Sequence, residues 1–224
     1  LCFMESVSSD NSSVSCPLCS DTRVNQFFID QRRNYLKCQG CNLVFVPKAF
    51  HLDKADEKRE YDLHQNYVQD EGYRKFLGRV SEPLLLRLPN GSRGLDFGCG
   101  PGPALSQMIE SAGHSMDLYD PYYSPNTSFK TNKYDFITAT EVLEHLAKPG
   151  YELDQLWSLL NSGGWLAIMT KRVTSLEAFA KWHYKNDPTH ISFFCESTFY
   201  FLAKNWETEA EFIGNDVVLF QKPY

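Results

Sequence analysis

The sequence has no apolar run that approaches the roughly 18 residues a helix needs to cross a bilayer. Its first fifteen residues lack the basic and apolar segments of a secretory leader. It also lacks an overall excess of basic charge, because the formal net charge is −6, whereas a large nucleic-acid footprint normally needs a strongly basic face. We therefore expect a soluble, cytoplasmic protein with no membrane partner.

The composition favours a folded chain with one main core and a small appendage. Of its 224 residues, 42% are hydrophobic and 14% aromatic, which is enough apolar surface to offset the entropy of ordering. Residues 1–15 are polar and are predicted to be disordered. Residues 16–50 contain five basic and two acidic side chains, a net charge of +3 on an otherwise acidic protein.

Four of the seven cysteines form two C-x-x-C pairs, Cys16 with Cys19 and Cys38 with Cys41. A gap of two residues lets both thiolates of a pair reach one tetrahedral ion at about 2.3 Å. The segment between the pairs has short β-favouring runs around a polar centre, as a hairpin would. The pattern predicts one structural Zn²⁺ in a zinc ribbon over residues 16–50. The alternative is a pair of disulfides.

The role of this ribbon has two interpretations. So short a segment cannot build its own core, so metal binding would supply on the order of 10 kcal/mol of its folding free energy. A ribbon that only folds or shapes a substrate site is one interpretation. The other is docking to RNA, which the local positive charge permits.

Residues 51–90 are predicted to form a helical linker or lid. Charged residues alternate there with apolar and aromatic ones at helical spacing, which favours two helices before a Pro-Asn-Gly turn. His64 and Tyr67 are candidates for covering a bound ligand, and the alternative is an ordinary packing face.

The most informative stretch is a strand, a glycine-rich turn and a helix. Residues 94–97 predict a short buried strand, Gly98, Gly100 and Gly102 follow it, and residues 104–112 predict a helix. A second strand ends at Asp120, 22 residues after Gly98. Glycines let a backbone approach a ligand closely, and an acid about 20 residues further on accepts hydrogen bonds from ribose hydroxyls.

A nicotinamide dinucleotide is one ligand for such a turn, but two details favour another. Asp96 lies two residues before Gly98, the first glycine of the turn. Pro103 departs from the spacing at which a dinucleotide-binding loop usually has its third glycine. A carboxylate there favours a cationic group over a pyrophosphate because of Coulomb attraction at short range. S-adenosylmethionine is a cationic cofactor with a ribose.

Three stretches resemble class I S-adenosylmethionine-dependent methyltransferases. GLDFGCGPG resembles their first motif, KYDFITATEVLEHLAKPG their fourth strand and the turn after it, and LLNSGGWLAIMTKR a helix, a double-glycine turn and the fifth strand. The resemblance implies an α/β fold with a Rossmann-like sheet, flanking helices and an antiparallel C-terminal hairpin, beside the small N-terminal zinc ribbon. We assign the cofactor-binding domain to residues 91–224.

The resemblance also implies the cofactor-binding residues. The methionine and ribose parts would lie against Asp96, Gly98, Gly100 and Gly102, the ribose hydroxyls against Asp120, and the rest of the site against Thr140 and Glu141. Only a short segment, PYYSPNTSFKTNK, replaces the usual third strand with its adenine-binding acid. The adenine is therefore expected on Pro121 or Tyr122.

Methyl transfer from a sulfonium needs an aligned acceptor and, for a hydroxyl, amine or carbon acid, a base. His190 and His145 are the candidates. The run around His190 resembles a segment of zinc-ribbon-bearing sugar C-methyltransferases in which a histidine faces the acceptor. The alternatives are a His190 that hydrogen-bonds the following strand and a His145 that packs beneath the cofactor turn. Lys171 and Arg172 either bind an anionic acceptor or are solvated.

The sequence thus predicts a methyltransferase for a small-molecule acceptor. Two other functions stay open. One is methylation of RNA docked by the ribbon, which the acidic character outside the ribbon disfavours. The other is a non-enzymatic, cofactor-binding interaction protein.

Overall fold

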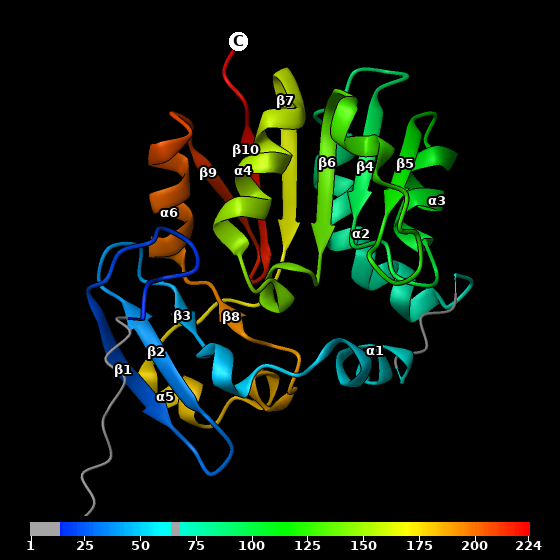
Figure 1. Cartoon of the computed structure of the whole chain (residues 1–224). Coiled ribbons are helices and arrows are strands. Elements are labelled where there is room, and N and C mark those ends of the chain that lie inside the picture. Colours follow the sequence, from blue (N-terminus) through cyan, green and yellow to red (C-terminus); the bar gives the residue numbers. More distant parts are fainter. Residues whose placement is uncertain (1–13, 64–67) are drawn as a thin grey trace, which may run out of the picture.

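The structure is a computed structural model that describes residues 14–63 and 68–224 (Figure 1). Residues 1–15 are expected to be disordered, and residues 1–13 of that range lie outside the described residues. The lid candidates His64 and Tyr67 also lie outside them. Within the described residues, the helices all fall short of the length and apolar character that crossing a membrane requires.

The helices and strands follow the order expected from the sequence. The helices are α1 (Lys54–Asp62), α2 (Glu71–Leu85), α3 (Ala104–Ser111), α4 (Pro149–Leu159), α5 (Leu176–Ala180) and α6 (Glu196–Asn205). The strands are β1 (Val24–Ile29), β2 (Asn34–Cys38), β3 (Val44–Phe45), β4 (Arg93–Phe97), β5 (Ser115–Tyr119), β6 (Tyr134–Thr140), β7 (Leu160–Met169), β8 (Ser192–Phe193), β9 (Ala210–Ile213) and β10 (Val217–Gln221). Four short 3₁₀ helices are η1 (Lys48–Phe50), η2 (Thr127–Thr131), η3 (Leu143–His145) and η4 (His183–Asn186).

The main sheet has six strands in the order β5-β4-β6-β7-β10-β9. β5, β4, β6 and β7 are mutually parallel, and β10 and β9 add an antiparallel hairpin at one edge. The carboxyl ends of the parallel strands therefore meet at one edge, where open α/β sheets bind ligands. Figure 1 shows α1 and the N-terminal strands beyond that edge.

Helices cover both faces of this sheet because its central strands are apolar on both sides. Alternate residues of β10 illustrate this: Val218 and Phe220 pack in the core with α4 and α6, whereas Val217 and Leu219 pack in the core with α2 and α3. The fold is thus the three-layer α/β arrangement expected from the sequence.

A second sheet joins the cysteine-rich segment to the rest of the chain. Its strand order is β1-β2-β3-β8, and all pairings are antiparallel. β1 and β2 form the hairpin expected between the cysteine pairs, but β8 comes from residues 192 and 193. The N-terminal segment therefore belongs to one hydrogen-bonded sheet with a segment that follows β7 in the chain.

Two local features refine the expectations. Gly163 and Gly164 lie inside β7 rather than in a turn before it. The pairing of β7 with β6 shifts register here, because Tyr134 pairs with Leu160 but Phe136 pairs with Trp165. The additional β7 residues between these pairs form a bulge. After Asp120 the chain has an isolated bridge to Ser124 and then η2, in place of a further parallel strand.

Candidate functional site

The glycine turn between β4 and α3 leaves open space where a ligand can approach. Gly98 and Gly100 have φ angles of 80° and 63°, which favour glycine. A Cβ on Gly98 would come within 2.3 Å of Val142, whereas a Cβ on Gly100 would meet no heavy atom of the described structure within 4 Å. The carbonyl of Gly102 accepts a hydrogen bond from the Ala104 amide at the start of α3.

Asp120 fixes the shape of this turn from the end of β5. Its Oδ2 accepts a hydrogen bond from the Gly100 amide at 3.1 Å, and its Oδ1 accepts from the amides of Tyr122 and Tyr123 at 2.8 and 3.1 Å. The residue is 8% exposed. Pro121, which follows it, is exposed. The carboxylate therefore organises the loop in addition to any bond it makes to a ligand.

Asp96 lies behind the turn rather than at its surface. The residue is 3% exposed, and its carboxylate accepts hydrogen bonds from Thr138 Oγ1 at 2.8 Å and Ser106 Oγ at 3.1 Å. Burial raises the pKa of Asp96 to about 6. At neutral pH it is mostly ionised and contributes negative charge beneath the turn.

Thr140 and Glu141, at the end of β6, carry polar atoms that lack partners. Thr140 Oγ1 and Glu141 Oε1 are buried and form no hydrogen bond within the described structure. Unpaired buried polar atoms are costly, so they mark positions where a ligand can supply the partner. Burial, and then the neighbouring Glu144, raise the pKa of Glu141 to about 8. Glu141 also has a positive φ of 52°, a strained backbone angle for a non-glycine residue.

The two predicted base candidates lie together at the same edge of the sheet. The ring centroids of His145 and His190 are 4.7 Å apart, although the two residues are far apart in sequence. His190 Nδ1 lies 2.7 Å from the carbonyl oxygen of Tyr184. Because a carbonyl only accepts, Nδ1 carries the proton, and Nε2 of the neutral ring keeps its lone pair. Burial, and then His145, lower the pKa of His190, so the ring is neutral at neutral pH.

Glu144 lies beneath this histidine pair. One of its oxygens accepts a hydrogen bond from Thr170 Oγ1 at 2.8 Å, and the other accepts from the Tyr184 hydroxyl. Ligand atoms of Glu144, His145 and His190 lie within 4.8 Å of one another. Both carboxylate oxygens already accept hydrogen bonds, which favours an orienting role for Glu144 over metal binding.

Helix α1 covers the carboxyl ends of β5 and β6. The Tyr61 ring lies 5.2 Å from the His145 ring and 5.6 Å from the Tyr122 ring, between centroids. Glu57 accepts hydrogen bonds from the hydroxyls of Tyr61 and Tyr122 at 2.9 and 2.6 Å. An aromatic row therefore spans from the loop after Asp120 to the histidine pair.

The four cysteines of the C-x-x-C pairs form one group. All four sulfur atoms lie within 4.8 Å of one another, with 3.5 Å between Cys16 and Cys41 and 3.5 Å between Cys19 and Cys38. These separations exceed a disulfide bond of about 2.05 Å and are close to the roughly 3.8 Å edge of a tetrahedron with metal–sulfur bonds of about 2.3 Å. The group can hold a metal ion, and the disulfide alternative does not fit it.

The cysteine group also contacts the main core. Cys16, Cys38 and Cys41 are buried in the same apolar cluster as residues of α4. A Cβ on Gly150, in the first turn of α4, would come within 2.2 Å of the Leu18 carbonyl oxygen. The first C-x-x-C turn therefore lies directly against the start of α4.

Several site residues were missed from the sequence. Glu57, Tyr61, Glu144, Asp187 and Tyr184 surround the histidine pair, and they come from three segments of the chain. The pair Glu57 and Tyr61 has the i,i+4 spacing of helical neighbours, which is a usable signal. No sequence pattern brings the three segments together.

One comparison with known proteins identifies a family. Residues 66–206 match the family described as "Methyltransferase domain". A comparison with curated proteins finds no match.

Three solved structures resemble the chain. The Burkholderia thailandensis 1,6-didemethyltoxoflavin-N1-methyltransferase, with 1,6-didemethyltoxoflavin and S-adenosylhomocysteine bound, is 15% identical and has a TM-score of 0.56, covering 89% of this chain and 99% of its own. A SAM-dependent methyltransferase from Archaeoglobus fulgidus is 16% identical with a TM-score of 0.51, and the match covers 66% of this chain and 94% of the other. A chain of the Haloferax volcanii complex between the Trm112 methyltransferase activator and a "putative methyltransferase" is 11% identical with a TM-score of 0.50. This match covers 77% of our chain and 100% of the other. At these identities the likeness establishes the fold alone.

Proposed function

Because the chain belongs to the methyltransferase-domain family, we propose that it transfers a methyl group from S-adenosylmethionine to a small-molecule acceptor. The observation that carries this proposal is the group of residues at the carboxyl ends of β4, β5 and β6. It combines an open glycine turn, organised by Asp120, with the two unpartnered polar atoms of Thr140 and Glu141. When bound, S-adenosylmethionine supplies a methyl group on a positively charged sulfur.

The proposed cofactor-binding residues fit a cationic ligand with a ribose. A carboxylate can accept about four hydrogen bonds, and three backbone amides already donate to Asp120. Asp120 can therefore still accept a hydrogen bond from a ribose hydroxyl near Gly100. Thr140 Oγ1 and Glu141 Oε1 offer unused polar atoms. Gly98, Gly102 and Pro121 complete the assignment. Asp96 acts from beneath, where its charge is only weakly screened.

The proposed base is the histidine pair. His190 is neutral, with a free Nε2, and can accept a proton from an acceptor hydroxyl, amine or activated carbon. His145 lies against it and is covered by Tyr61. Asp187 Oδ2, 3.7 Å from His190 Nε2, would stabilise the imidazolium that results.

The proposed metal is one structural Zn²⁺ held by Cys16, Cys19, Cys38 and Cys41. A closed set of four thiolates leaves no open position, which is typical of structural rather than catalytic zinc. Within this proposal, residues 16–50 are the ribbon, residues 51–90 the helical cover and residues 91–224 the cofactor-binding part.

Calorimetry with S-adenosylhomocysteine tests the proposal on the full, zinc-loaded chain. We expect saturable binding that Asp120→Asn weakens by roughly 1–3 kcal/mol, or about 5- to 150-fold, because a charge-assisted hydrogen-bond pair is lost. The matched control is Asp154→Asn, an exposed position on α4 that makes the same charge change. Equal affinity in the Asp120 variant and the wild type would remove Asp120 from the site, and no binding by the wild type would reject the proposal.

A further inference from the structure

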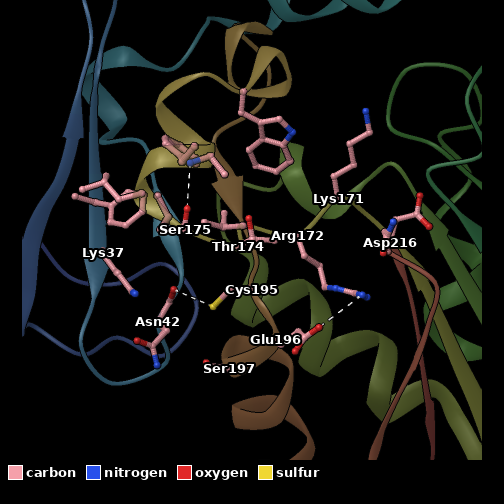
Figure 2. A pocket seen from close by; sticks show the side chains of 18 of the residues that line it. Lys37, Asn42, Lys171, Arg172, Thr174, Ser175, Cys195, Glu196, Ser197 and Asp216 are labelled. Atoms are coloured by element: carbon pink, nitrogen blue, oxygen red, sulfur yellow. Dashed lines mark hydrogen bonds and ion pairs between the residues drawn. The ribbon is translucent and has the colours of Figure 1, made fainter.

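A cavity of about 860 Å³ is lined by none of the proposed cofactor-binding residues. It is bounded by the N-terminal sheet on one side and, on the other, by the segment after β7, the start of α6 and the β9–β10 turn. Figure 2 shows Lys37 extending from the N-terminal sheet and Lys171 from the segment after β7. Cavities of about 300–1,000 Å³ are large enough for a small organic molecule.

One wall of the cavity is apolar and aromatic. It is formed by Phe27, Val44, Phe179 and Trp182. The Phe179 ring packs edge-on against Phe27 and Trp182, with centroids 5.2 and 6.0 Å away, so these rings support one another. A flat apolar body suits such a wall because it can bury area against rigid rings.

Four basic side chains line the cavity, and two of them form no ion pair within the described residues. Arg79 pairs with Asp216, and Arg172 lies 3.8 Å from Glu196. Over residues 14–63 and 68–224, by contrast, no ion pair involves Lys37 or Lys171. Their ammonium groups lie over the rings of Phe27 and Tyr184, at 5.7 and 5.0 Å, and Lys171 also interacts electrostatically with Glu141. The cavity therefore carries a local positive charge on a chain whose net charge is −6.

The cavity lies beside the aromatic ring that packs on the proposed catalytic group. Lys171 lies over the face of Tyr184, whose ring centroid is 4.1 Å from that of His190. Thr170, the residue before Lys171, donates a hydrogen bond to Glu144. Lys171 and Trp182, which line the cavity, thus both contact the ring that packs against His190.

We propose that this cavity binds the methyl acceptor, and that the acceptor has a flat apolar body and an anionic group, a carboxylate or a phosphate, that pairs with Lys37 or with Lys171. This inference rests on the proposed function, because it assigns a substrate class to the same reaction. The N-terminal sheet then serves as one wall of the acceptor site, as well as holding a metal.

Binding of three related probes tests the proposal. They are 2-naphthoate, 2-naphthyl phosphate and the neutral 2-naphthalenemethanol, titrated by calorimetry into the full, zinc-loaded chain saturated with S-adenosylhomocysteine. We expect at least one anion to bind at least tenfold more tightly than the alcohol, and the tighter anion shows whether the site prefers a carboxylate or a phosphate.

Charge-removing variants locate the binding site. At least one of the variants Lys37→Gln and Lys171→Gln should weaken anion binding roughly tenfold, by loss of a charge-assisted contact, and leave the alcohol unchanged. Lys204→Gln, an exposed position later on α6, is the matched control and should bind like the wild type. Thermal unfolding of each variant verifies that it is folded.

The inference is overturned if the alcohol binds as tightly as the anions, if both lysine variants bind the anions like the wild type, or if no probe binds. In those cases the proposed function stands as long as S-adenosylhomocysteine itself binds. Lysine-dependent anion binding without any S-adenosylhomocysteine binding would instead reject the proposed function, and with it the acceptor role of the cavity.

Discussion

Glu144 shows at the scale of single residues how one buried acid organises a reactive group. The residue is fully buried, and burial raises its pKa. Tyr184 and Thr170 donate to its two oxygens, and its carbonyl oxygen accepts from the Ile191 amide at 2.7 Å. Burial also raises the pKa of Tyr184, so its hydroxyl stays protonated and remains a donor. The segment that carries His190 is thereby fixed to the end of β6.

The lowered pKa of His190 leads to a prediction about pH. An imidazole whose pKa is lowered in the folded state stays neutral at a pH where ordinary histidines, with pKa values of about 6.5, are half protonated. We expect a ¹H–¹³C NMR titration to show one ring that titrates below that range, with His190→Gln identifying the signal.

The same shift has a consequence for stability. Below about pH 6.5 the unfolded chain binds a proton at this position before the folded chain does, so the free energy of unfolding should fall as the pH drops further. His190→Gln should make that fall shallower when unfolding is followed in urea. Ordinary titration of every histidine in the wild type would contradict the assignment.

At the scale of elements, the tip of the β1–β2 hairpin holds the segment around η4. Arg33 is 6% exposed, and its guanidinium donates to the carbonyl oxygens of Asp187 at 2.7 Å and Pro188 at 3.1 Å. Lys185, in η4, pairs in turn with Asp30 at 3.0 Å. The N-terminal hairpin therefore supports the segment that carries His190.

Removing this support should loosen the segment. We expect Arg33→Met to lower the free energy of unfolding by roughly 2–4 kcal/mol, because buried carbonyl groups lose their donor. For a chain of this length that corresponds to a fall in Tm of roughly 5–10 °C. Hydrogen exchange of residues 183–190 should also become faster.

The neighbouring residue provides the control. Arg32 makes one exposed hydrogen bond to Asn186, so Arg32→Met should change the free energy of unfolding by less than about 0.5 kcal/mol. Equal effects of the two variants would show that the hairpin tip does not position the segment.

At the scale of the whole molecule, the cysteine group is part of the main core rather than of a separate module. Its sulfurs lie in the apolar cluster that includes α4, Gly150 lies against the first C-x-x-C turn, and β8 pairs with β3. A metal at this position would stabilise two sheets at once. Unfolding should therefore be a single cooperative transition.

Metal removal tests this coupling. We expect one Zn²⁺ per chain by mass spectrometry, and a fall in Tm of roughly 10 °C or more in one calorimetric transition when a chelator removes it. Cys41→Ser should have the same effect, whereas Cys195→Ser, outside the cysteine group, should keep both the metal and the Tm. A metal-free chain with the Tm of the wild type would contradict the coupling.

The sequence alone determined the features that depend on short spacings along the chain. The C-x-x-C spacing predicted the group of four sulfurs, and the resemblance of three stretches to class I methyltransferases implied the α/β sheet with its antiparallel hairpin; the structure confirms both. The roles assigned to Asp120, His145 and His190 stay predictions, although the structure brings the two histidines together.

Only the tertiary structure decided which distant segments meet. Strand β8 completes the N-terminal sheet, Arg33 reaches the carbonyl groups before His190, and Lys37 and Lys171 line one cavity. Each of these contacts joins residues more than a hundred positions apart. Local periodicity carries no information about such pairs, because the packing of two sheets against one core, rather than the spacing within either, brings them together.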